Sequence, residues 1–158
     1  MDYKSDCKFV TENMTHYNLE KDFLKEVESI ADETNRREVL STDQIKRLIS
    51  QYPRVPQDYI IYLQEIGAGN FRECKFKVQS SLFNLVDLGL EEHYEVKSNV
   101  WFFGDNYCGD FSGFDFDSDD ANVVEFWLEN GELYYTNKSF QNYIREQMLM
   151  DENGNDNS

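Results

Sequence analysis

The side chains best suited to chemistry are the carboxylates of the acidic run DFDSDD, residues 115–120. Alternating carboxylates of this kind can bind calcium. An EF-hand loop beginning at Asp115 would need glycine at its sixth position for the turn and glutamate at its twelfth to bind the ion. Those positions hold Asp120 and Phe126, and Glu125 lies one place too early. We therefore expect a solvated acidic face and no metal site, with a metal-dependent hydrolase as the least favoured alternative.

Histidine and cysteine are poorly placed for zinc or nucleophilic chemistry. The two histidines, His16 and His93, are far from each other and from any cysteine in the sequence. Cys108 lies beside Asp110, and a neighbouring carboxylate raises the pKa of a thiol instead of activating it. We expect no catalytic residue and no cofactor, and we do not expect an enzyme.

The overall charge restricts the possible partners. The chain of 158 residues has 15 basic and 31 acidic residues and a net charge of −16. Such a field repels nucleic acid and anionic membranes and favours basic partners, although it would also serve solubility alone. An apolar fraction of 40% predicts one folded domain. Three scattered cysteines without a CxxC pair, and a first segment unlike a signal peptide, predict a cytoplasmic protein.

Residues 99–117, NVWFFGDNYCGDFSGFDFD, are the stretch around which the chain is organised. Residues 100–103 form an apolar run of the length of a buried strand, and residues 104–106 have the composition of a turn. After Cys108-Gly109-Asp110, phenylalanines alternate with glycine and aspartate. The pattern predicts two antiparallel strands joined by a Gly/Asp-rich loop, with aromatics on one sheet face and carboxylates on the other.

Three amphipathic helices are predicted before this stretch. The first has apolar residues every three or four positions: Leu19, Phe23, Val27 and Ile30. The second begins at Ser41, which has the spacing of a capping box with Gln44, and ends before Pro53. The third begins near Pro56 and ends at Gly67, which supplies a left-handed terminus.

The remaining elements complete an α+β domain. Strands are predicted from residue 76, and residues 123–129 and 132–136 form a hairpin at Asn130-Gly131. A short helix is one interpretation of residues 87–97, and Ser139 opens a last helix. We expect a single domain over residues 19–150, with a central, mostly antiparallel sheet and helices packed on one side. Residues 1–18 are predicted to be a loose arm, and residues 151–158 a disordered acidic tail.

Adjacent aromatic residues leave one question open. Strand alternation must send some of Trp101, Phe102, Phe103, Phe126 and Trp127 to the face that the helices do not cover. Either a further segment covers that face, or exposed rings serve as anchors for a partner.

The order of motifs resembles the SUKH superfamily. The run YPRVPQDYIIYLQEIGAGNF, residues 52–71, is similar to the N-terminal signature of that superfamily. The strand VWFF, the Gly104-Asp105 turn, Gly109-Asp110 and FDFD resemble its central strands and loop, and the strand EFW and helix SFQNYI follow in matching order. The resemblance covers about residues 42–147. It implies a mostly antiparallel sheet with helices on one side and a non-catalytic binding role.

Many bacterial members of this superfamily look like immunity proteins that neutralise a cognate secreted toxin, often a nuclease, and eukaryotic relatives regulate cell-wall synthesis. The first hypothesis is therefore an immunity protein whose acidic surface binds a basic toxin domain, without direct contact to nucleic acid or membrane. A regulatory scaffold that binds a host protein is the second.

We expect a monomer or a weak homodimer. Candidate contacts are Trp101, Asp105, Asp110, Asp115, Asp117, Asp119, Asp120 and Trp127.

Overall fold

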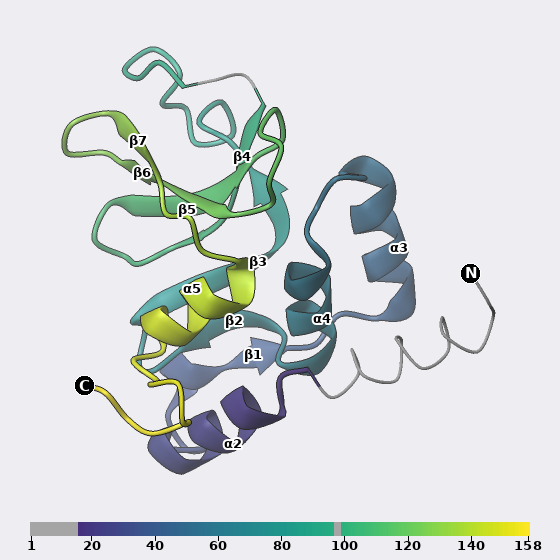
Figure 1. Ribbon diagram of the computed structural model, residues 1–158, viewed down its shortest axis with the longest axis vertical. Helices are drawn as coiled ribbons and strands as arrows, with labels where there is room; N and C mark the ends of the chain where they lie inside the picture. Colours follow the sequence, from purple (N-terminus) through teal and green to yellow (C-terminus); the bar gives the residue numbers. More distant parts are fainter. Residues whose placement is uncertain (1–15, 97–98) are drawn as a thin grey trace.

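The computed structural model describes residues 16–96 and 99–158, which build one seven-stranded antiparallel sheet (Figure 1). Each strand pairs with the next one along the chain, so the sheet is a meander in the order β1 to β7. This confirms the predicted α+β class and the antiparallel sheet. The strands are β1 (Arg37–Glu38), β2 (Ala68–Phe71), β3 (Phe76–Phe83), β4 (Val100–Asp105), β5 (Asp110–Asp115), β6 (Val123–Trp127) and β7 (Glu132–Tyr135).

The helices pack against one face of this sheet, as predicted. They are α2 (Asn18–Val27), α3 (Thr42–Gln51), α4 (Gln57–Glu65) and α5 (Phe140–Gln147), with a 3₁₀ turn η1 (Glu33–Asn35). These four helices of the described residues contribute to a single apolar cluster with the sheet. At its centre Phe103 of β4 contacts Phe140 of α5, with ring centroids 4.8 Å apart. In Figure 1, β6 and β7 lie at the end of the molecule away from α2, so the sheet extends beyond the helices.

The second sheet face is covered by the segment between β3 and β4. Leu85, Leu90 and Tyr94 of this segment pack against Phe102 and Phe126, which are both fully buried. This answers the question left open by the adjacent aromatics, because a further segment covers the far face. The segment forms turns at residues 85–89 and 91–93, and the short helix considered there is absent from the described residues.

The first helix differs from its prediction in the residues it buries. Phe23 is buried as expected, but Leu19 is 38% exposed and Ile30 is fully exposed beyond the end of α2. The helix instead buries Glu20, which forms an ion pair with Arg145 of α5. The predicted loose arm falls mostly outside the described residues, and at its end Tyr17 is a fully buried core residue.

The C-terminal residues 151–158 are not the disordered tail that the sequence predicts. The Asp151 carboxylate accepts hydrogen bonds from the backbone of Asn153 and Asn155, which forms a turn. Met150 then pairs with Asp156, whose carboxylate forms an ion pair with Arg72 at 3.4 Å. The local turn is therefore supplemented by an ion pair between Asp156 and Arg72, which is distant in sequence.

The capping box of α3 is confirmed and gives a first test. The Ser41 hydroxyl accepts from the Gln44 backbone N–H at 3.2 Å, and the Gln44 side chain accepts from the Ser41 N–H at 2.7 Å. Replacing Ser41 by alanine is expected to lower the free energy of unfolding by about 1 kcal/mol, measured by urea denaturation. Ser50→Ala, at an exposed position within the same helix, is the control and should cost nothing. Equal losses in both variants would contradict the role of the cap.

Candidate binding surface

The structure divides the acidic residues that the sequence grouped together. Asp105 and Asp110 lie at one end of the β4–β5 hairpin, whereas Asp115, Asp117, Asp119 and Asp120 lie at the other. Asp110 and Asp115 are the two ends of β5, so about 17 Å separates them at about 3.3 Å per residue. The six carboxylates therefore do not form a single patch.

At the first end, the carboxylates fix the β4–β5 loop. Asp105 accepts from the backbone N–H of Tyr107 at 3.0 Å, and Asp110 accepts from the Asn106 side chain at 2.9 Å. The side-chain amide oxygen of Asn106 accepts in turn from the backbone N–H of Cys108 at 2.8 Å. These bonds hold the loop in one shape and leave Asp110 half-exposed.

At the second end, Asp115 is not part of the exposed acidic surface that the sequence predicts. Its side chain is only 4% exposed, and its carboxylate accepts from the Tyr135 hydroxyl at 2.7 Å. Arg54 donates to the backbone oxygens of Phe116 and Ser118 in the adjacent loop. A guanidinium therefore lies among the acids of this end, whose exposed members are Asp117, Asp119 and Asp120.

The two tryptophans share a sheet face but lie apart. Trp101 pairs with Phe114, which pairs with Val123, and both partners belong to the apolar cluster under the helices. Trp101 therefore lies on the helix side of the sheet, where its ring centroid is 5.1 Å from that of Tyr52. Trp127 is four residues beyond Val123 on the same face, at the end of β6 that pairs with Asp110. Of the two, Trp127 is on β6, which lies with β7 at the end of the molecule away from α2 (Figure 1).

Strands β5, β6 and β7 form a polar and aromatic surface there. The register aligns Asp110 with Trp127 and Glu132 in one row. A second row aligns Ser112 with Glu125 and Tyr134. Paired residues of antiparallel strands point to the same face. Along β5 and β6, the second row lies two residues from the buried pair Phe114 and Val123 and the first row lies four, so both rows share the face of that pair. We call the six residues the β5–β7 platform: Asp110, Ser112, Glu125, Trp127, Glu132 and Tyr134. Ser112 is fully buried, and the other five are partly or fully exposed.

Hydrogen bonds hold the platform side chains in place. The Trp127 indole N–H donates to one oxygen of Glu125 at 3.1 Å, and the Tyr143 hydroxyl of α5 donates to the other at 2.5 Å. Burial raises the pKa of Tyr143 above its ordinary value, and the bond to Glu125 adds to the effect, so this hydroxyl keeps its proton. Tyr134 donates to Glu132 at 2.9 Å, and its ring packs against Trp127 in a tilted arrangement with centroids 4.2 Å apart.

Sequence reasoning found two platform residues, Asp110 and Trp127, and missed the other four: Ser112, Glu125, Glu132 and Tyr134. Alternation along VVEFW already places Glu125 and Trp127 on one face. What was missing was the register, because only pairing across three strands brings Glu132 and Tyr134 beside them.

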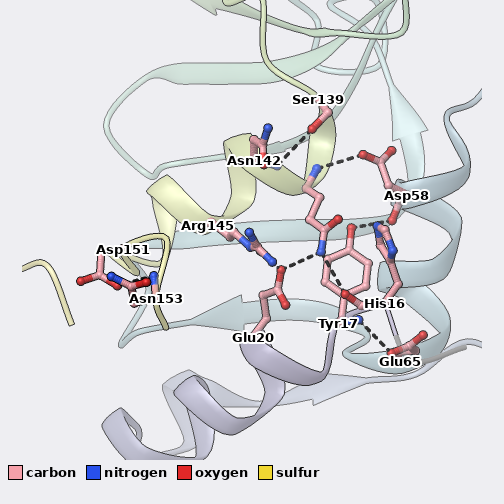
Figure 2. Close-up of polar contacts among 11 residues, drawn as sticks. His16, Tyr17, Glu20, Asp58, Glu65, Ser139, Asn142, Arg145, Asp151 and Asn153 are labelled. Carbon is pink, nitrogen blue, oxygen red and sulfur yellow. Dashed lines mark hydrogen bonds and ion pairs between the residues drawn. The ribbon is translucent and has the colours of Figure 1, made fainter. Parts of the chain in front are cut away.

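A second polar cluster joins α2, α4 and α5 and is structural (Figure 2). Glu20 accepts from Arg145 at 2.7 Å and from Gln141 at 2.8 Å, and the Gln141 backbone donates to Asp58 at 3.0 Å. The Tyr17 hydroxyl donates to the Asp58 carbonyl oxygen at 2.7 Å. Burial raises the pKa of the Asp58 carboxyl, although backbone N–H donors lower it. These groups bond to one another between packed helices, so the β5–β7 platform is the better candidate for contact with a partner.

Comparisons with protein-family models, curated proteins and solved structures found no match for this chain. Across residues 16–96 and 99–158, histidine, cysteine and carboxylate side chains form no group of three or more that could hold a metal ion. In the same residues, every helix is too short or too polar to span a lipid bilayer.

Proposed function

We propose that the chain is a non-catalytic immunity-type protein that binds and neutralises a cognate secreted toxin with a basic, nucleic-acid-binding domain. The observation that carries the proposal is the β5–β7 platform, where three carboxylates and two aromatic rings share a partly exposed sheet face. The resemblance of residues 52–71 and 100–117 to SUKH signatures supports the immunity class.

The charge distribution suits such a partner. A net charge of −16 attracts a basic domain over a distance of about one Debye length and repels the nucleic acid that competes for the same groove. The carboxylates of Asp110, Glu125 and Glu132 are already held by hydrogen bonds, so they lose little side-chain entropy on binding, which favours affinity.

The partner itself would be identified by recovering the tagged full chain from its own cells and analysing bound proteins by mass spectrometry. A secreted protein with a basic C-terminal domain, whose toxicity in co-expression is abolished by the chain, would support the proposal. Recovery of housekeeping or cell-wall proteins alone at physiological salt would favour the regulatory scaffold and overturn the immunity function.

Charge reversal then tests the surface. The double variant Asp110→Lys/Glu132→Lys is expected to lower the association rate with that toxin about tenfold at low salt, because it removes steering from the platform. The matched control Asp119→Lys/Asp120→Lys changes the charge by the same amount at the other end of the hairpin. Stopped-flow fluorescence measures both rates, and a smaller effect is expected for the control. Equal rates for the two variants would argue against the platform as the binding surface.

A further inference from the structure

The β5–β7 platform has features that select one kind of basic side chain. We propose that the partner presents an arginine whose guanidinium stacks on the Trp127–Tyr134 ring pair and bonds to the platform carboxylates. This inference rests on the proposed function and specifies the chemistry of the toxin segment that the surface accepts.

Hydrogen bonds hold both rings of the pair, which suits stacking. Trp127 and Tyr134 are both half-exposed, and their rings lie 4.2 Å apart at an interplanar angle of 38°. The polar group of each ring forms a hydrogen bond to a carboxylate: the Trp127 indole N–H donates to Glu125, and the Tyr134 hydroxyl donates to Glu132. Asn130 also donates to the Tyr134 hydroxyl at 2.8 Å. An exposed face of such a ring attracts a cation, and the planar guanidinium is the cation that also stacks.

The carboxylates around the rings are available for charged hydrogen bonds. None of the ion pairs formed among residues 16–96 and 99–158 uses Asp110, Glu125 or Glu132. A carboxylate offers about four lone-pair sites, so these groups can accept further bonds beside those they already accept. Guanidinium donors have the fork geometry that matches a carboxylate.

Other occupants fit this surface less well. A phosphate-bearing ligand would meet three carboxylates and be repelled. An apolar helix would remove those carboxylates from water without pairing them, which costs several kcal/mol for each buried charge. A second copy of this chain would bring another net charge of −16. Lysine would satisfy the charge but lacks the planar face.

The test uses the full chain labelled with ¹⁵N and the peptide tetra-arginine as probe. The chain has two tryptophans, so its spectrum has two indole N–H signals, which the Trp127→Phe variant assigns. We expect saturable movement of the Trp127 signal on titration, while the Trp101 signal stays in place. Tetra-lysine, with the same charge, is expected to bind about two- to fivefold more weakly, because it lacks the stacking contribution.

Variants of the hairpin provide the controls. Tyr134→Leu and Glu132→Gln are expected to weaken tetra-arginine binding several-fold, whereas Glu129→Gln, exposed in the adjoining turn, should not. The amide spectrum of each variant shows whether it is folded. Equal affinity for the two peptides, movement of both indole signals, or an unchanged Trp127 signal would overturn the inference. If the chain captures a toxin but does not bind tetra-arginine, the proposed function stands and the arginine inference fails. If the chain binds tetra-arginine but captures no toxin, the proposed function alone is refuted.

Discussion

Replacing Arg145 by alanine is expected to lower the free energy of unfolding by about 3–5 kcal/mol, because it leaves a buried carboxylate without its counter-charge. Glu20 is fully buried on α2, and its oxygen lies 2.7 Å from the Arg145 side chain on α5. The two residues face each other between the helices (Figure 2). Gln141 would remain as a neutral donor, which cannot compensate the charge. Urea denaturation followed by circular dichroism measures the loss.

Two further variants separate the buried charge from other effects of the substitution. Lys138→Ala removes an exposed ion pair with Glu146, whose side chains are 42% and 54% exposed, and should cost about 0–1 kcal/mol. The double variant Glu20→Leu/Arg145→Leu removes both charges and should be more stable than Arg145→Ala. If Arg145→Ala cost no more than Lys138→Ala, the carboxylate would not depend on its ion pair.

Replacing Phe103 by alanine is expected to cost about 3–5 kcal/mol, the range for removing a large buried aromatic side chain. Phe103 is fully buried, and its ring lies 4.8 Å from Phe140 and 5.1 Å from Phe114. Because it lies between the sheet and α5, its loss leaves a cavity lined by rings that cannot all move inward. Thermal and urea denaturation should both report the change.

Phe111→Ala is the matched control for this substitution. Phe111 lies on the other face of the same hairpin and is only half-buried, so less apolar surface returns to water when it is removed. A loss for Phe103→Ala no larger than that for Phe111→Ala would contradict the central place of Phe103 in the core.

The same helix that closes the core also positions the binding surface. The Tyr143 ring of α5 packs on Phe76 and Phe103, while its hydroxyl bonds to Glu125 and Ser112 of the platform. The orientation of the Glu125 carboxylate, and through it the Trp127 indole, therefore depends on how α5 packs.

The sequence by itself determined the elements whose signals are local. The capping box at Ser41 and the helix end at Gly67 formed as predicted, and the hairpin at Asn130-Gly131 formed with β6 ending two residues earlier, at Trp127. Each depends on hydrogen bonds or backbone angles within a few residues, so residue type and spacing are enough to predict it. The alternation of β4 and β5 likewise predicted two paired strands.

Only the tertiary structure decided which side chains meet. Glu20 is buried because its counter-charge comes from Arg145, 125 residues further along the chain. Asp115 is buried in the folded domain. Glu125, Trp127 and Tyr134 come together because the strand register aligns β6 with β7. A one-residue change of register would move every side chain of a strand to the other face. Pairings of this kind are set by the packing of the whole domain, and a local sequence pattern does not specify that packing.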